Sequence, residues 1–471
     1  WRCERRFASM TCEMSKLPLC LILLAAVLPA QDSPATKRLK ARFPEYEKRI
    51  TKVSPHVYVA TGYTVSSTAM IVGENGVVIV DPGQAVPGSR EIRAEFEKIT
   101  DKPVRAIVYT HGHGDHTGGA AAFLDPGSKV EVWARANYGS EEARNAETGI
   151  QGARPVNTQG FDLPPQQRMG IGIAMPPNRR PPGNMMRDGA NRDAGAPRPR
   201  AQAVEPTNTF AEARHKLSIA GLDLELVAAP GETDDHLYVW YPAERVVFAG
   251  DNLYRSWPNV YPLRGTARRS VRDWIASHSK MIDEDPLHAV GGHSTPFVGD
   301  GKAVLTAHRD ALQYVYEQTI AGASEFKTPD ELVATIHLPE NWARRDDLGD
   351  YYGSVESTIR DIYAQDLGWF DGDPLNLHRE SPREQSQRMA DLLGGADALM
   401  TKAKAALAGD DPLGAAQLAQ HAMRLRPDNP APKLLLADAL AILGERTFNA
   451  PARNYTLAYS NWLRRQAGAA Q

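Results

Sequence analysis

The residues best suited to chemistry stand together in one short stretch, HGHGDH, which contains His111, His113, Asp115 and His116. Neutral imidazole and carboxylate groups bind divalent metals such as zinc. On an extended chain, histidines two positions apart point to the same side and can share one ion, whereas Asp115 and His116 can reach a second ion nearby. The glycines between them let the backbone bend closely around the cluster. A surface loop that is only rich in histidine does not need these four residues at fixed spacing after a buried strand, so the stretch predicts a metal centre.

Hydrophobic periodicity predicts the elements that must position this stretch. Residues 56–80 contain β-branched and aromatic runs broken by the hairpin signal Glu-Asn-Gly. Residues 103–110 form another buried strand, and residues 89–101 carry apolar side chains at helical spacing. A further helix is expected to start at Thr117 or Gly118. This order of strands and helices predicts a layered α/β domain.

Strand patterns return in the second half of this domain, and each of three strands adjoins a residue that can bind a metal. These residues are His236, Asp251 and His293. A single histidine of this kind is more often a surface or core residue than a ligand. The predicted strands are 215–231, 236–242, 245–251 and 286–293.

The remaining segments set the domain organisation. Residues 150–207 are rich in Pro, Gly and Arg without a period, which predicts an irregular or disordered insert. The alternative is a lid whose arginines cover a substrate anion. Residues 45–300 are therefore expected to form the catalytic domain, and residues 301–471 an all-α region. Within it, residues 381–446 resemble tetratricopeptide-type helical hairpins, although a small helical domain or a dimer interface explains them equally well.

Charge and the first thirty residues bear on partners and location. The 471-residue chain has a formal net charge of −3, which argues against nucleic acid as a partner and against a nuclease. Residues 1–31 contain a lysine, an apolar run from Leu17 to Leu28 and a small-residue end, which is typical of a secretory signal peptide and its preceding context. The run is shorter than the ~20 residues of a membrane span. The protein is expected to be periplasmic or secreted, and all three cysteines lie in this segment.

The motif H-x-H-x-D-H after a strand resembles the signature of the metallo-β-lactamase fold, an αββα sandwich of two sheets flanked by helices. The resemblance implies two metal ions, most simply Zn²⁺, with Mn²⁺ or iron also compatible with such ligands. Asp81 matches a family aspartate that supports the site from behind. The implied ligands are His111, His113 and His236 for one ion, Asp115, His116 and His293 for the other, and Asp251 as a bridge.

Segments outside the metal motif resemble the alkyl sulfatase (linear alkylsulfatase) branch and its helical dimerisation domain. They are residues 251–265, 348–377, with YYG-V and GWFDG-P, and 450–463. The resemblance implies a sulfate ester substrate and a homodimer. Arg264 lies where that branch places a sulfate-binding arginine, and a guanidinium fork suits sulfate oxygens.

Other roles on this branch are assigned by resemblance alone. Tyr363 is the candidate for an aromatic hydroxyl that binds sulfate, and Trp369 with Phe370 could line an apolar slot for the alkyl chain. The implied mechanism is attack by a water activated by two divalent ions, with Asp115 and Asp251 orienting the water.

Alternatives follow from one departure from the branch. Alkyl sulfatases carry glutamates at the positions of His236 and Asp251, whereas this chain has the residues of the general hydrolase pattern. A β-lactamase, lactonase or other ester hydrolase of the same fold is therefore the near alternative. A non-catalytic binding or assembly protein that works through its helical region is the alternative from another class.

Overall fold

The fold is described from a computed structural model that covers residues 32–148, 154–160, 162–176, 204–266 and 268–468. The predicted signal segment 1–31 lies outside the described residues, as do residues 177–203 of the insert. Among the described helices, none combines the length and apolar character needed to cross a membrane.

Two β-sheets form the centre of the domain that precedes the long helices. The first has seven strands in sequence order, β1 to β7, and the second has six in the order β13-β12-β11-β10-β9-β8. The strands of the first sheet are Arg49–Lys52, Val57–Thr61, Thr68–Val72, Val77–Val80, Val104–Val108, Glu131–Arg135 and Asn208–Phe210. Those of the second, β8 to β13, are Arg214–Ile219, Leu222–Ala228, Leu237–Tyr241, Val246–Gly250, His288–Gly291 and Phe297–Val298.

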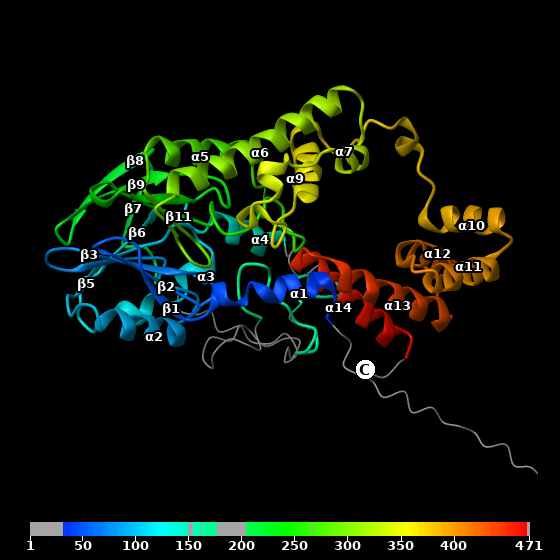
Figure 1. Cartoon of the computed structure of the whole chain (residues 1–471), viewed down its shortest axis with the longest axis horizontal. Helices are drawn as coiled ribbons and strands as arrows, with labels where there is room; N and C mark the ends of the chain where they lie inside the picture. The colour runs from blue at the N-terminus through cyan, green and yellow to red at the C-terminus, as the bar shows by residue number, and fades with distance from the viewer. Residues whose placement is uncertain (1–31, 149–153, 161, 177–203, 267, 469–471) are drawn as a thin grey trace, which may run out of the picture. The chain divides into compact units, whose positions relative to one another are not determined.

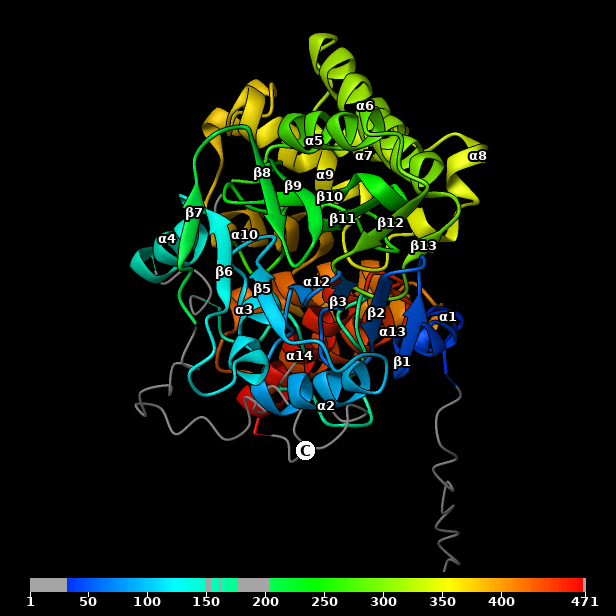
Figure 2. The same cartoon turned by 90° about the vertical axis from the view of Figure 1, so that its left-hand side faces the viewer.

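Three hydrophobic clusters stack these elements into four layers. One cluster lies between the sheets and joins side chains such as Val59 and Leu226. A second packs the outer face of the first sheet against helix α2 (Val86–Glu97), and a third packs the second sheet against α5 (Val271–Asp283) and α6 (Gly301–Ser324). Figures 1 and 2 show α2 on one side of the strands and α5 and α6 on the other. The predicted αββα sandwich is confirmed.

Parallel pairing decides where the metal-binding loops meet. Strands β4 and β5 are parallel and joined through α2, and β11 and β12 are also parallel. Because parallel strands end at the same edge of a sheet, the loops that follow them lie side by side there. Asp81 and His111 follow the first pair, and Asp251 and His293 follow the second.

After β13 the described chain consists of helices and the loops that join them, with no strand among the described residues, as predicted for an all-α region. Helices α11, α12, α13 and α14 pack as consecutive neighbours. The helices between α6 and α14 are α7 (Pro329–Thr335), α8 (Glu340–Ala343), α9 (Val355–Ile362), α10 (Pro382–Leu393), α11 (Ala396–Ala408), α12 (Pro412–Leu425) and α13 (Pro430–Arg446), and α14 is Ala450–Gln466.

The described part of the insert is irregular but packed. Between residues 154 and 176 the described chain has turns and bends rather than helix or strand, yet Val156 and Leu163 are buried against α14. Arg453 Nη1 donates to the carbonyl of Gln167 at 2.9 Å, which fixes the segment to the helical region. The described part therefore agrees with the irregular form of the prediction, and its buried apolar side chains hold it in place.

Candidate metal centre

The metal motif lies at the end of β5 and opens a short helix. His113 is the N-terminal cap of α3 (Gly114–Thr117), so the helix begins earlier than the predicted start at Thr117 or Gly118. Asp115 and His116 therefore lie on the first helical turn, and the ring of His116 lies beside that of His111, with 4.3 Å between centroids. His111 and His116 are buried, whereas Asp115 has a side chain that is 24% exposed.

Asp251 stands at the centre of the converging side chains. Its two carboxylate oxygens lie 3.2 Å from His116 Nε2 and 3.1 Å from His293 Nε2, and one of them lies 4.0 Å from His111 Nε2. Asp115 Oδ2 lies 3.7 Å from His293 Nε2 and 3.8 Å from His116 Nε2. Six predicted ligand residues share one cluster, because the ring of His113 also contacts that of His111, with 4.6 Å between centroids.

Four of these histidines are held from behind by a second group on the protein. In each, one ring nitrogen bonds to that group and the other faces the cluster, which is how metal-ligating histidines are oriented. Asp81 has the supporting position that the resemblance implied, and it also accepts a hydrogen bond from Thr110. The pairs are His111 Nδ1 with Thr110 Oγ1 (2.9 Å), His116 Nδ1 with Asp81 Oδ2 (2.8 Å), His293 Nδ1 with the Val65 carbonyl (2.9 Å) and His113 Nε2 with Glu141 Oε1 (3.3 Å).

His236 and Glu232 compete for the remaining ligand position. The ring of His236 stacks beside that of His111, with 5.0 Å between centroids. The closely spaced groups of ligand atoms found among the described residues nevertheless include His113, Glu232 and Asp251, and His236 belongs to none of them. Sequence reasoning missed Glu232, although it stands only four residues before His236 in the same loop.

Unpaired buried atoms support a cation at this site. His116 Nε2, His236 Nε2 and one oxygen each of Asp251 and Glu232 are buried without a hydrogen-bond partner. Orphaned buried polar atoms are costly unless something binds them. Gly292 lets the ligand loops approach, because a β-carbon there would lie 1.9 Å from Asp251 Oδ1. The donor set of imidazoles and carboxylates fits divalent cations.

Burial and mutual contacts set the protonation of these side chains. Burial and the neighbouring histidines lower the pKa of His111 well below its usual range, and burial lowers the pKa of His236 to about 3. Burial opposes ionisation of Asp251, but His293 and His116 lower its pKa well below normal.

Burial also opposes charge on His116, His293 and His113, but neighbouring carboxylates, Asp251 for the first two and Glu141 for the third, raise their pKa values. A bound cation would displace these protons, because the forms that bind metals are neutral imidazoles and ionised carboxylates.

A buried network of charges supports the His113 side of the site. Arg269 Nη1 pairs with Glu232 Oε1 at 2.5 Å, and Arg269 Nη2 lies 3.5 Å from Glu141 Oε1. Glu141 also accepts a hydrogen bond from the Thr266 hydroxyl. All of these residues are buried and were missed, because only the fold brings α4 (Ser140–Thr148) to the 266–269 loop.

The predicted sulfate-binding residues have different positions. Arg264 is half-buried and interacts electrostatically with the Tyr352 hydroxyl, which in turn feels the Glu232 and Asp251 carboxylates. Burial and Glu232 raise the pKa of Tyr352 to about 12, so its phenol stays a proton donor. Tyr363 instead packs in the hydrophobic cluster that contains Trp257, and Trp369 is 81% exposed. The roles proposed for Tyr363, Trp369 and Phe370 stay predictions.

An αββα sandwich with this cluster at its strand ends defines a protein of the metallo-β-lactamase superfamily, and the profile of that superfamily matches residues 61–293. The profile described as alkyl sulfatase dimerisation matches residues 328–466. A linear primary-alkylsulfatase from a Pseudomonas species is 33% identical over 402 residues, which are 82% of this chain and 72% of that protein. The chain therefore belongs to the alkylsulfatase family of the metallo-β-lactamase superfamily.

More distant relatives agree. An (R)-specific secondary-alkylsulfatase from Pseudomonas is 26% identical over 434 residues, which are 88% of this chain and 62% of the relative. The solved structure of the stereoselective inverting sec-alkylsulfatase Pisa1 from Pseudomonas matches with a TM-score of 0.73 at 24% identity. It covers 90% of this chain and 66% of that one, and the likeness shows a shared fold.

Proposed function

We propose that the protein hydrolyses sulfate esters of small organic alcohols, R–O–SO₃⁻, with water to give the alcohol and hydrogen sulfate. The observation that carries the proposal is the convergence of His111, His116, His293, Asp115 and Asp251 around one point in a chain of the alkylsulfatase family. Arg264, which interacts electrostatically with Tyr352, supplies a cation matched to a sulfate monoanion.

The ligand residues would hold two divalent cations. His111, His113 and Glu232, with His236 behind them, would form one set, and Asp115, His116 and His293 the other, with Asp251 between the sets. Cations held there would lower the pKa of a water molecule and polarise a sulfate oxygen. Imidazole and carboxylate ligands suit zinc, and they also accept manganese or iron.

The protein's own groups would bind and orient the reactants. The Arg264 guanidinium pairs with the sulfate oxygens, and the Tyr352 phenol donates a hydrogen bond to the same group; Tyr363 stays the candidate that the resemblance implies. The Asp115 and Asp251 carboxylates accept hydrogen bonds from the attacking water and orient it. As charge grows on the transferred sulfate, Arg264 and Tyr352 stabilise it in a site from which most water is excluded.

The direct test is a substrate panel combined with metal analysis. Wild type loaded with zinc or manganese should release sulfate from alkyl and aryl sulfates and act poorly on lactones and nitrocefin. Asp251→Ala should lose at least ~10³-fold in kcat/KM together with bound metal, because the central carboxylate is gone. Asp330→Ala, a change at an 85% exposed carboxylate on α7, is the matched control. Absence of sulfate release under every metal loading would sink the proposal.

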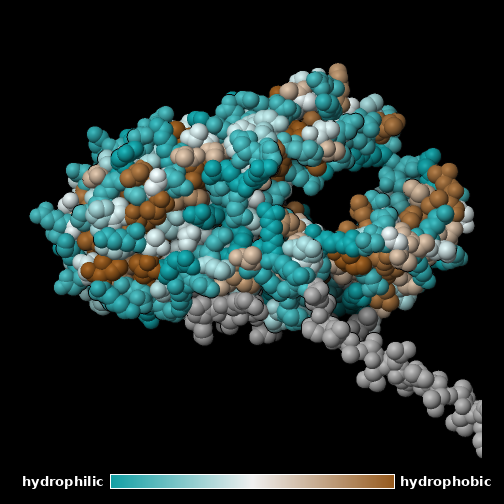
Figure 3. Space-filling view, in the orientation of Figure 1, coloured by the Kyte–Doolittle hydropathy of each residue, from teal (hydrophilic) through white to brown (hydrophobic). Residues whose placement is uncertain are grey.

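A homodimer is proposed from the dimerisation region. Large apolar side chains are exposed in this region, and apolar residues gather on the surface over α10 to α12 (Figure 3). Exposed apolar patches of this kind mark interaction surfaces. The side chains are Trp369, Leu375, Leu377, Leu392 and Leu413.

A further inference from the structure

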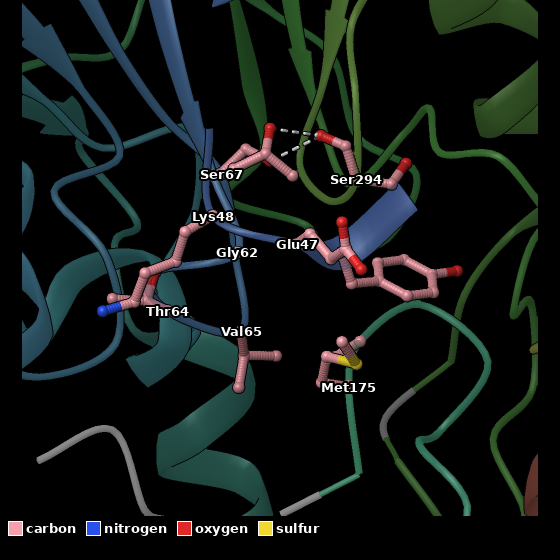
Figure 4. Close-up of a pocket in the computed structure, with 11 residues that line it drawn as sticks. Glu47, Lys48, Gly62, Thr64, Val65, Ser67, Met175 and Ser294 are labelled. Atoms are coloured by element: carbon pink, nitrogen blue, oxygen red, sulfur yellow. Dashed lines mark hydrogen bonds between the residues drawn. The ribbon is translucent and has the colours of Figure 1, made fainter. Parts of the chain in front are cut away.

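The two proposed sets of metal ligands are supported by different parts of the chain. The set that contains His293 is held by the loop between β2 and β3. There the Val65 carbonyl accepts from His293 Nδ1 at 2.9 Å, and the Ser67 hydroxyl donates to the carbonyl of Ser294 at 2.8 Å. Figure 4 shows the hydrogen bond between Ser67 and Ser294 beside a cavity of about 150 Å³. This support comes from within the two-sheet domain.

The set that contains His113 and Glu232 depends instead on the buried Arg269. The Arg269 guanidinium pairs with Glu232 Oε1 at 2.5 Å and lies 3.5 Å from Glu141 Oε1. Glu141 in turn lies 3.3 Å from His113 Nε2. One arginine therefore fixes both a candidate ligand and the carboxylate that orients another, and groups behind metal ligands of this kind strongly affect metal affinity.

The backbone of Arg269 is held by the helical region. Helix α9 ends in a π-helical turn, η8 (Tyr363–Leu367), and such turns are rare and frequently occur at functional sites. The amide nitrogen of Gln365, on this turn, donates to the Arg269 carbonyl at 3.3 Å. It also donates to the buried Asp361 carboxylate, and the amide oxygen accepts from Arg268 Nε. A single side chain therefore contacts the chain on both sides of the peptide bond between residues 268 and 269.

We propose that Gln365 is a positioning residue of the metal centre. By holding the backbone of Arg269 it keeps the guanidinium against Glu232, and it thereby supports the half of the centre that contains His113 but not the half that contains His293. The region that matches the dimerisation profile, residues 328–466, then completes a centre whose ligands all lie in the two-sheet domain. The inference rests on the proposed two-cation centre and adds which part of the chain maintains each half.

Zinc titration of the full chain tests this assignment without requiring turnover. Competition with a chromophoric chelator measures the dissociation constant of each Zn²⁺ ion. Gln365→Met, which keeps the length of the side chain and removes its hydrogen bonds, should weaken one of the two ions at least about tenfold and leave the other unchanged. Gln387→Met is the matched control, because Gln387 on α10 pairs with Asp391 at 2.8 Å with the same four-residue spacing. It should leave both ions unchanged.

A double-mutant cycle with Glu232→Gln separates positioning from general destabilisation. The Glu232→Gln chain should retain only the ion of the set that contains His293, and in this background Gln365→Met should have no further effect on zinc affinity. Ser67→Ala should weaken that remaining ion, because it removes a hydrogen bond behind His293. If Gln365→Met weakens the remaining ion as strongly as it weakens binding in the otherwise wild-type chain, or changes neither ion there, Gln365 does not position this half.

A second variant keeps the test decisive if the methionine variant does not fold. Gln365→Glu retains the acceptor for Arg268 and lacks the donor to the Arg269 carbonyl, and the same weakening of one ion is expected. A wild type that binds fewer than two Zn²⁺ ions would overturn the assignment of the two halves. Sulfate release is not measured in these titrations, so the expected cycle without sulfatase activity would overturn the hydrolysis proposal alone.

Discussion

Glu232 belongs both to the buried charge network that supports the site and to the set of candidate metal ligands. Its Oε1 pairs with the buried Arg269 and lies 3.9 Å from His113 Nδ1, and its Oε2 is buried without a hydrogen-bond partner. Burial raises the pKa of Glu232 to about 7, against the attraction of Arg269. A cation within reach of the free oxygen would compensate the cost of burying a carboxylate there. His236, which has one free buried nitrogen, is the alternative ligand.

We predict that Glu232→Gln lowers bound metal from about two ions to about one per chain, because a neutral amide is a weak ligand for zinc. The amide oxygen still accepts from Arg269, so the fold is retained. His236→Gln is the matched change, and it should weaken metal affinity while keeping both ions at saturation. Elemental analysis after dialysis measures the difference. Equal metal content in the two variants would contradict the assignment of Glu232 as the ligand.

The ligand set shows how far sequence can predict a site. His111 to His116 were predictable because their spacing is local, and Asp251 and His293 because each follows a strand whose pattern is visible in sequence. The structure brings these predicted ligands together. Glu141, Arg269 and Tyr352 have no local signal, since their proximity arises from packing of distant segments. Tyr352 and Tyr363 both lie in residues 348–377, the segment that resembles alkyl sulfatases. Only the fold shows that their side chains have different surroundings.

At the scale of elements, the loop that carries Tyr352 is fixed by the start of helix α14. The Asn449 side chain caps α14 by accepting from the Ala452 amide at 2.9 Å. Its amide nitrogen donates to the carbonyls of Asp350, Tyr352 and Gly353 at 3.2, 2.9 and 3.0 Å. One side chain therefore connects the helical region to a residue beside the metal centre.

We predict that Asn449→Ala lowers the free energy of unfolding by about 2–3 kcal/mol, because a cap and buried hydrogen bonds are lost together. It should also raise KM for sulfate esters severalfold, since Tyr352 is less fixed. Asn429→Ala removes only the cap of α13, where Asn429 accepts from Ala431, and should cost about 1 kcal/mol. Denaturant unfolding and steady-state kinetics measure both. A normal KM in Asn449→Ala would refute the link to Tyr352.

A buried acid on α9 makes stability depend on pH. Asp361 is 5% exposed, and burial raises its pKa to about 7 despite a hydrogen bond from Gln365. Because the folded pKa lies above the unfolded value, the protonated form stabilises the fold at low pH, and this stabilisation is lost as pH rises through about 7.

Asp361→Asn should therefore raise the thermal midpoint at pH 8 and change it little near pH 4. The gain above pH 7 is on the order of 4 kcal/mol, at about 1.4 kcal/mol for each pKa unit of the shift. Thermal unfolding at pH 4, 6 and 8 measures it. Asp330→Asn, at the exposed carboxylate on α7, should change stability by less than about 0.5 kcal/mol at each pH. A parallel response of the two variants would remove Asp361 as the cause.

At the scale of the whole molecule, the layers of sheets and helices were predictable from sequence, but the contacts between the insert and the helical region were not. Alternating patterns such as 215–231 specify strands and helical spacing specifies α2, so a layered α/β domain followed from local periodicity, whereas the αββα sandwich followed from the resemblance of the H-x-H-x-D-H motif. The insert was predicted from composition to be irregular or disordered, and its described part is irregular but packs on α14 through contacts such as Asn454 to the Gln159 carbonyl at 3.1 Å. Contacts between residues so far apart in the chain do not produce a periodic pattern in the sequence, so the sequence does not predict them.

The last prediction concerns assembly, because Leu375 and Leu377 are 76% and 54% exposed in a region that matches a dimerisation profile. Burying each of these leucines in a homodimer interface stabilises the dimer by ~1.5–3 kcal/mol. We expect a dimer by light scattering after gel filtration, and a monomer for the double change Leu375→Lys and Leu377→Lys. Phe326→Lys is the control, since Phe326 is 86% exposed and precedes the matched region. A dimer that survives the double change but not Phe326→Lys would move the interface away from the dimerisation region.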